Sequence, residues 1–484
     1  MKNSKSLSVN AFLNGIRNAL NLVFPLITFP YVSRVLSVDG MGIYNFSSTY
    51  VNYFLLIAGL GISTYAVREG AKYRDNTERI NTFASQIFTI NIISTVVAYV
   101  LLLLSLVVFG SLHNYASAIL IFSIQLVFTT IGTEWIYTIY EDFSYITIRS
   151  ISFKIISIAL LFIFVKTPSD YLWYASITVF ASVGSNIFNY IHAKSFSCIK
   201  LVKQTDWQHH LKPTLIIFAS SLAVTLYVSC DTTLLGLLKD EHAVGIYGVA
   251  VKIYSIVGGT LSAVLTVTIP RLALLYGKGK FEDYRKLLSK VFDTLSILVL
   301  PSSVGLIMLS KEVVLIIASA KYLDSTFSLQ IITWAIIFSN FSWIFNQCVL
   351  IPAKRETKSL RNTLLTVGIN IGLNFILIPV WSYNGTALST VISEFLVMLM
   401  NGYSARDIVS KIIFTKKSVN NFVTSIIGCV GIVAVCIICQ SLISSIVMRV
   451  FLSVFMSLII YVSALILLKN EIAIQSWEKI KQRL

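Results

Sequence analysis

Polar side chains recur inside long apolar runs, at the spacing that places them on one face of a helix. In the run NGIRNALNLVFPLITFP, Arg17 lies between Asn14 and Asn21. Steps of three and four residues bring these side chains to one helical face. A guanidinium is permanently charged and offers a planar fork of donors that suits phosphate, while amides can bind sugar hydroxyls. We therefore predict that Arg17, Asn14 and Asn21 bind an anionic headgroup.

Two later runs show the same pattern. One stripe follows steps of three and four residues and comprises Gly248, Lys252, Ser255, Gly259, Ser262 and Thr266. A second comprises Thr363, Thr366, Asn370 and Asn374. We assign Lys252, Asn370 and Asn374 to substrate binding. Two alternatives stay open, namely that such residues only let helices pack and hydrogen-bond, and that Arg17 extends its stem to the cytoplasmic interface.

Carboxylates at membrane depth are rare and typical of functional sites. Glu134, Asp231 and Glu394 are our candidates for coupling to an ion gradient or for charge pairs. One expected face comprises Thr130, Glu134, Tyr137 and Glu141. Asp231 is expected to pair with Lys252 at similar depth; the alternative is that Asp231 faces extracellular water.

Pro25 and Pro30 each remove a helical hydrogen bond, so the first apolar run is expected to be kinked or partly broken. We predict that they form a gate; a static kink that only serves packing is the alternative. Cys436 and Cys439 are spaced as CxxC but have no second pair or nearby His, and the five His lack metal-ligand spacing. No nucleotide-binding phosphate loop, nucleophile elbow or HExxH motif occurs. We expect no metal, no cofactor and no catalytic residues.

The elements that position these residues must be membrane helices. Of 484 residues, 56% are hydrophobic and 12% charged, and the mean hydropathy is +0.79. We expect an all-α polytopic membrane protein with about fourteen spans of roughly 20 residues. They lie near 10–35, 42–66, 82–110, 116–139, 145–166, 171–193, 213–237, 244–268, 288–310, 325–350, 362–381, 384–405, 420–443 and 446–468.

The formal charge of +16 reflects membrane orientation. Most Lys and Arg residues fall on alternate connections, such as 271–290 and 354–361, which the positive-inside rule places in the cytoplasm. Both termini are then cytoplasmic, and the outer connections are too short for an extracellular catalytic domain. This distribution also argues against nucleic-acid binding.

The chain repeats a short motif. Gly42-Ile43-Tyr44 recurs as Gly245-Ile246-Tyr247, and Arg68 recurs as Arg271 at the same offset of 203 residues. An even number of spans separates the copies, which indicates a parallel repeat. We expect two six-helix lobes at 1–211 and 212–410, followed by two additional helices at 411–484.

Five motifs in order resemble the polysaccharide or O-antigen flippases, a Wzx-like family within the multidrug, oligosaccharidyl-lipid and polysaccharide exporter superfamily. They are FPLITFPYVSRVLSVDGMGIYNF with LLIAGLGISTYAVREGAK, GTEWIYTIYEDFSYITIRS, YVSCDTTLLGLL with VGIYGVAVKIYS, LIPAKRETKSLRNTLLTVGINIGLNFILIP, and NGTALSTVISE. The resemblance implies two lobes around a central cavity and alternating access in a bacterial cytoplasmic membrane. It further implies an undecaprenyl-diphosphate-linked oligosaccharide as cargo, membrane lipids around the tail, and a polysaccharide polymerase and chain-length regulator as partners.

Related multidrug exporters expel cations and typically need acidic cavity groups, whereas the stripes here contain Arg17 and Lys252. This difference favours anionic cargo. A multidrug or cation antiporter and a membrane-embedded polysaccharide polymerase remain the alternatives. The sequence does not predict which glycan is carried or which gradient drives transport.

Overall fold

Helices form every regular element in the part of the chain that the computed structural model describes, residues 24–266, 268–413 and 415–474. Eleven helical segments among these residues are long and apolar enough to cross a membrane. Many of their large apolar side chains face outward, as in Val96, Val100 and Leu104 of one helix and Phe451, Val454 and Leu458 of another. An outward apolar surface of this kind is typical of helices that contact lipid.

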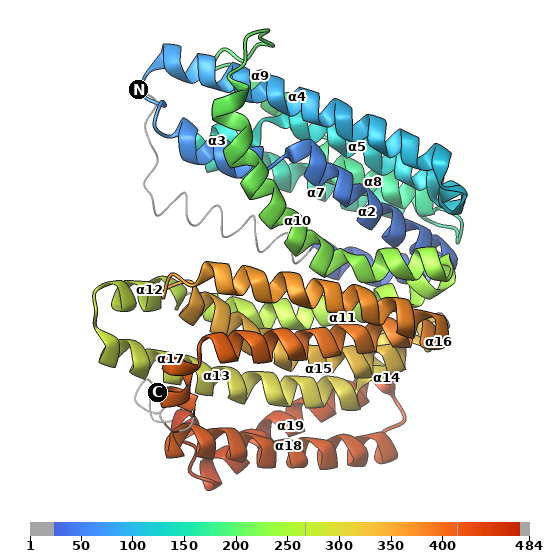
Figure 1. Cartoon of the computed structure of the whole chain (residues 1–484). Helices are drawn as coiled ribbons and strands as arrows, with labels where there is room; N and C mark the ends of the chain where they lie inside the picture. The colour runs from blue at the N-terminus through green and yellow to red at the C-terminus, as the bar shows by residue number, and fades with distance from the viewer. Residues whose placement is uncertain (1–23, 267, 414, 475–484) are drawn as a thin grey trace. The chain divides into compact units, whose positions relative to one another are not determined.

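The chain forms two compact units, residues 1–245 and 246–484. Within each unit the helices lie side by side (Figure 1). Unit 1 contains a helix over residues 24–35, α2 (Val38–Gly59), α3 (Ile62–Gly70), α4 (Thr77–Val108), η1 (Gly110–Tyr115), α5 (Ala116–Gly132), α6 (Glu134–Ile139), α7 (Phe143–Phe164), α8 (Tyr171–Val183), α9 (Asn186–Ala193) and α10 (Trp207–Leu238). The first turn of α11 (Glu241–Thr266) also belongs to it.

Unit 2 contains the rest of α11 and the elements that follow it. These are α12 (Ile269–Gly277), α13 (Phe281–Met308), α14 (Ser310–Ile317), η2 (Ala320–Tyr322), α15 (Ser325–Trp343), the π-helix η3 (Ile344–Leu350), α16 (Glu356–Ser404), α17 (Arg406–Ile413), α18 (Lys416–Leu442) and α19 (Ile446–Leu467). Helices α18 and α19 pack against each other, and α18 also packs against α13. The last two apolar helices are therefore part of unit 2.

Side chains cap several helix starts, which satisfies backbone N–H groups that a helix leaves without a partner. The capping oxygens accept from backbone N–H groups three residues on, at Ser37, Asn76, Asp206 and Thr415. These starts follow polar residues at the ends of apolar runs, as the sequence suggests.

Helix α16 kinks at Ser382 (φ 49°, ψ −130°), between the expected spans 362–381 and 384–405, where the sequence analysis placed a boundary. Other expected spans are interrupted. The expected span 171–193 is divided into α8 and α9 at Gly184 and Ser185. The span expected at 116–139 breaks after α5 at Thr133, whose φ is +42°.

The break after α5 corrects one expectation. Glu134 and Tyr137 lie on α6 rather than on the helix of Thr130, so the predicted continuous face of Thr130, Glu134, Tyr137 and Glu141 is wrong. The side chain of Asn186 lies against the end of α5, where its Nδ2 donates to Phe128 O at 3.0 Å.

Helix α10 lies in unit 1, and the expected lobe boundary at residue 211 stays a prediction. Helix α10 packs against α2 and α3 of unit 1. Its His210 contacts Tyr65 OH at 2.8 Å and Gln86 Oε1 at 2.9 Å, and Thr233 contacts Tyr53 OH at 3.0 Å. The division into six, six and two spans stays a prediction.

The repeated motif lies where two helix starts meet. A Cβ added to Gly42 would lie 1.7 Å from Glu241 O, and one added to Gly245 would lie 2.2 Å from Val38 O. Only glycine allows the two backbones to come so close. The repeat therefore marks a backbone contact between the starts of α2 and α11.

Candidate functional site

The predicted polar stripe of α16 lies inside unit 2. Asn370 is 2% exposed and Asn374 is fully buried. Asn374 Nδ2 donates to the backbone and side-chain oxygens of Asn370 at 3.0 and 3.1 Å, and its Oδ1 accepts from Ser389 Oγ at 2.8 Å. The asparagines thus join the two halves of α16 across the kink. A substrate-binding role for them stays a prediction.

Lys252 lies on the less covered side of α11. Gly248, Lys252 and Ser262 are half-buried and Ser255 and Gly259 are exposed, while Val249, Ala250 and Ile253 on the other side are buried. A Cβ added to Gly258 or Gly259 would meet nothing within 4 Å. Within unit 2, and among the described residues, Lys252 forms no ion pair. This charge therefore remains available to a ligand or to a group from elsewhere.

The candidate carboxylates lie in separate places. Asp231 is buried in α10 of unit 1 and Glu394 is buried in the second half of α16 in unit 2, while Glu134 is half-buried in α6. Asp231 and Lys252 belong to different units, so their pairing stays a prediction.

The N-terminal stripe of Asn14, Arg17 and Asn21 lies outside the described residues. Pro25 and Pro30 are described, and the helix runs without interruption over residues 24–35. Pro30 O accepts from Ser33 Oγ at 3.3 Å and from Arg34 Nη1 at 2.8 Å. No break occurs in this described stretch, and the gating role of the prolines stays a prediction.

Unit 1 contains a cationic site that our sequence analysis missed. Arg149 of α7 is half-buried, and its Nε and Nη1 are buried without a hydrogen-bond partner among the described residues. Its guanidinium carbon lies 5.3 Å from the centre of the Tyr145 ring. A buried guanidinium nitrogen without an acceptor is unfavourable. The arrangement favours an acceptor supplied by a ligand.

Aromatic rings surround Arg149. Tyr145 stacks on His192 with ring centres 4.0 Å apart, and Tyr137 lies 5.7 Å from both rings in a nearly parallel plane. Tyr137 OH donates to Asn189 O at 2.6 Å, which joins α6 to α9. The rings of three helices therefore form a firm platform next to one cation.

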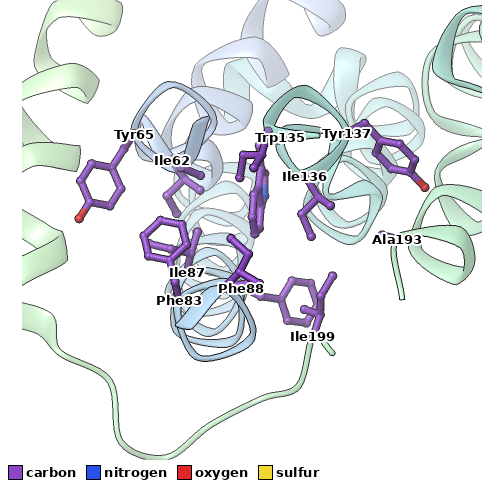
Figure 2. Packing of buried hydrophobic residues seen from close by; sticks show 14 of the residues in the cluster. Ile62, Tyr65, Phe83, Ile87, Phe88, Trp135, Ile136, Tyr137, Ala193 and Ile199 are labelled. Carbon is purple, nitrogen blue, oxygen red and sulfur yellow. The ribbon is translucent and has the colours of Figure 1, made fainter. Parts of the chain in front are cut away.

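The buried core of unit 1 supports this platform. Figure 2 shows Trp135 and Ile136 beside Phe83, Ile87 and Phe88 in one cluster of buried residues. Tyr137 belongs to the same cluster and lies beside Ile136, with its hydroxyl pointing outward. Short helix α6 thus contributes Trp135, Ile136, Tyr137 and Ile139 to the core, and Tyr137 also contacts α7 and α9.

The sequence feature that pointed to Arg17, an arginine inside an apolar run, is also present at Arg149. FSYITIRSISFKIISIALLFIF is an apolar run with one arginine near its start. No polar stripe accompanies this arginine, because its aromatic partners come from α6 and α9.

The ends of α16 and α17 carry a surface ion pair. Arg355 Nη1 and Nη2 each donate to one carboxylate oxygen of Asp407 at 2.7 Å. The guanidinium holds the pKa of Asp407 below its usual value. Because Asp407 is more than half exposed, the pair contributes little to stability and mainly orients this connection.

These features define a class of membrane protein. The chain has the fold of a solved structure titled "Lipid II flippase MurJ, inward closed conformation", with a TM-score of 0.71, 15% identity, and coverage of 96% of this chain and 99% of that one. It is also similar to the inward-facing conformation of a multidrug resistance MATE family transporter of the MOP superfamily, with a TM-score of 0.63, 16% identity, and coverage of 81% and 95%.

The chain belongs to the polysaccharide biosynthesis protein family, whose sequence pattern matches residues 7–275, more than half of the chain. This match confirms the family predicted from the motifs. A protein named "Putative O-antigen transporter" from Escherichia coli (strain K12) is 25% identical over 277 residues, 56% of this chain and 66% of that protein. A protein of the same name from Shigella dysenteriae is 24% identical over 398 residues, 81% of this chain and 98% of that protein.

Proposed function

We propose that this protein is a flippase that moves a polyprenyl-diphosphate-linked oligosaccharide from the cytoplasmic to the outer leaflet for surface polysaccharide synthesis. Its family and its relatives named as O-antigen transporters support this class of cargo. The lipid that bears the glycan is undecaprenyl diphosphate, and the membrane is the bacterial cytoplasmic membrane with both chain termini inside. A polysaccharide polymerase and a chain-length regulator act on the cargo afterwards.

One observation carries the proposal. Beside the Tyr145 ring, Arg149 holds two buried donor nitrogens that have no acceptor among the described residues. Such donors suit a phosphate oxygen, because a charge-assisted hydrogen bond from arginine is among the strongest that a protein makes. With the topology expected from the positive loops, Arg149 lies near the cytoplasmic end of its span, where the headgroup would enter.

The proposed mechanism is alternating access. The headgroup and sugars enter from the cytoplasm while the tail stays in lipid, and closure inside with opening outside exposes them to the other leaflet. A diphosphate diester carries about two negative charges, and an inside-negative potential contributes about 2.3 kcal/mol per charge for each 100 mV. The potential then supplies roughly 4.6 kcal/mol for outward movement at 100 mV.

The MATE-like fold favours one second candidate, a multidrug or cation antiporter. The two candidates differ in the charge of the cargo. A cation carrier would lose activity when Glu134, Asp231 or Glu394 is neutralised and would tolerate the loss of Arg149.

Replacing Arg149 by Met is expected to slow flipping of lipid-linked oligosaccharide between about tenfold and about a hundredfold. A hydrogen bond to a charged group contributes about 1.5–3 kcal/mol, and methionine keeps the apolar bulk without the donors. Arg149→Lys keeps the charge without the fork and should retain part of the rate. Flipping is measured in vesicles that contain the purified protein.

The matched control is Arg74→Met, which removes an exposed arginine that pairs with Glu141 at 3.2 Å. Its rate should stay near that of the wild type. A well-folded Arg149→Met protein that flips the cargo at the wild-type rate would exclude Arg149 from headgroup binding.

A further inference from the structure

A buried carboxyl group of unit 2 lies apart from all the residues discussed so far. Asp293 of α13 is 1% exposed. Its Oδ2 accepts from Asn421 Nδ2 of α18 at 2.9 Å, and its Oδ1 has no hydrogen-bond partner among the described residues. Its donors are Asn421 and the hydroxyl of Ser418, and neutral donors alone do not compensate a carboxylate that has lost its water.

Among the described residues, no unpaired cation acts on this carboxylate. The charged groups that act on Asp293 are Lys417 of α18 and Glu471, which follows α19. These two form an ion pair with each other, so their combined charge is close to zero.

Other elements packed against α13 carry charged groups, but none of these groups within the described residues acts on Asp293. Arg271 of α12, Lys311 of α14 and Lys411 of α17 are exposed. Helix α15 carries no ionisable side chain over Ser325–Trp343. The carboxylates of the neighbouring helices α14 and α17 already have partners, in the pairs Glu312–Arg449 and Asp407–Arg355. Lys290, one turn before Asp293 on α13, is exposed.

The segment that follows α19 fixes the orientation of Asn421. Asn470 is fully buried and donates to Asn421 O at 3.3 Å and to Thr424 Oγ1 at 2.8 Å. Asn421 Oδ1 accepts from the backbone N–H of Glu471 at 3.3 Å. The amide oxygen is therefore occupied, and the amide presents its hydrogens to Asp293. Hydrogens suit a carboxyl group and disfavour a metal cation at the same place.

We propose that Asp293 is a proton-binding site, which holds a proton while α18 and the segment 470–474 are packed against it. The proton resides on Oδ1, because Oδ2 accepts from Asn421. When this packing opens, water reaches the carboxyl group, its O–H bond breaks, and the proton passes to water. Proton exchange is thereby coupled to movement of α18 and the C-terminal segment against α13, whatever the cargo.

Infrared spectroscopy of the full chain in nanodiscs at pH 7 tests the proton directly. The wild-type protein should show the carbonyl band of a protonated carboxyl group, shifted in D2O, and Asp293→Asn should lose it. The control Asp283→Asn removes an exposed carboxylate of the same helix and should keep the band. Identical band intensity in the wild type and in Asp293→Asn would overturn the proposal.

A second variant keeps the test decisive if Asp293→Asn folds poorly. Asp293→Glu retains a carboxyl group, so it should move the band to a different frequency rather than remove it. A spectrum of Asp293→Glu that matches the wild type would contradict the assignment.

The pH dependence of unfolding provides an independent measurement. An aspartate of an unfolded chain ionises at about pH 4, whereas the folded protein keeps the proton on Asp293. Above this pH the folded state binds one more proton, so the unfolding equilibrium constant should rise up to about tenfold per pH unit through this site. Asp293→Asn should lack this contribution. If the unfolding free energy of both proteins changes equally with pH, the proton-binding site is refuted. Neither measurement involves transport, so neither tests the proposed cargo.

Discussion

Joining positions 39 and 242 with a short bismaleimide, after both are replaced by Cys, is expected to stop transport completely. Asp39 Oδ1 lies 2.8 Å from His242 Nδ1, and both side chains are more than half exposed, so the reagent can reach them. Beside them the backbones of α2 and α11 meet at Gly42 and Gly245. In the expected topology this contact lies at the outer end of both helices. We predict that outward opening in the proposed alternating-access cycle moves the start of α11 away from the start of α2, and the cross-link prevents this movement.

The cross-linking experiment needs a background without reactive native thiols. Cys198 is exposed and is replaced by Ser, whereas the other five cysteines are buried. Each single-cysteine variant treated with the same reagent should transport normally. Transport at the wild-type rate by protein that is fully cross-linked would show that this contact stays closed throughout the cycle.

Arg449→Ala is expected to destabilise the protein by about 3 kcal/mol. Arg449 Nη1 donates to Glu312 Oε1 at 3.0 Å, and the Glu312 side chain is only 4% exposed. Arg449 also donates from Nε and Nη2 to Ile443 O at 2.9 and 2.8 Å, which ties the connection between α18 and α19 to α14. Removing the arginine leaves a buried carboxylate without its cation, and such losses cost about 3–5 kcal/mol. The partial exposure of Arg449 favours the lower end.

Lys311→Ala is the matched control, because it removes an exposed cation next to Glu312. Equilibrium unfolding in detergent should show a change below about 0.5 kcal/mol for this variant. Equal stability of Arg449→Ala and Lys311→Ala would mean that the buried pair does not stabilise unit 2.

Composition and apolar run length were sufficient to predict an all-helical membrane protein, because a bilayer leaves the backbone few other solutions. The interruptions were harder to predict. At the break Thr133 has a positive φ, and Gly132 before it packs against the side chain of Asn186, which lies far along the chain. No local pattern around Thr133 reveals that contact.

The candidate site shows the same limit. Helical periodicity correctly placed Asn370 and Asn374 near each other, yet it could not show that Ser389 from the other half of α16 would cover them. Asp293 and Arg149 were missed for a related reason. Each lies near the start of an apolar run, and groups from other helices complete its surroundings. Which helices surround a charge is a property of tertiary packing.

The glycine repeat could be predicted from the sequence only in part. The sequence showed that Gly42 and Gly245 correspond, and it suggested a duplicated element. The structure adds that the starts of α2 and α11, which contain the two copies, pack against each other through these glycines. The two copies of a sequence repeat can thus also pack against each other.

The central claim is that the protein flips an anionic lipid-linked oligosaccharide, and reconstitution tests it most directly. Purified protein is placed in vesicles with fluorescent undecaprenyl-diphosphate-linked oligosaccharide, and potentials and ion gradients are imposed across the membrane. We predict that the headgroup moves to the outer side, faster when the cytoplasmic side is negative, and that heat-inactivated protein moves none. A protein that leaves this lipid in place under every gradient, while exchanging a cationic drug for protons, would contradict the account.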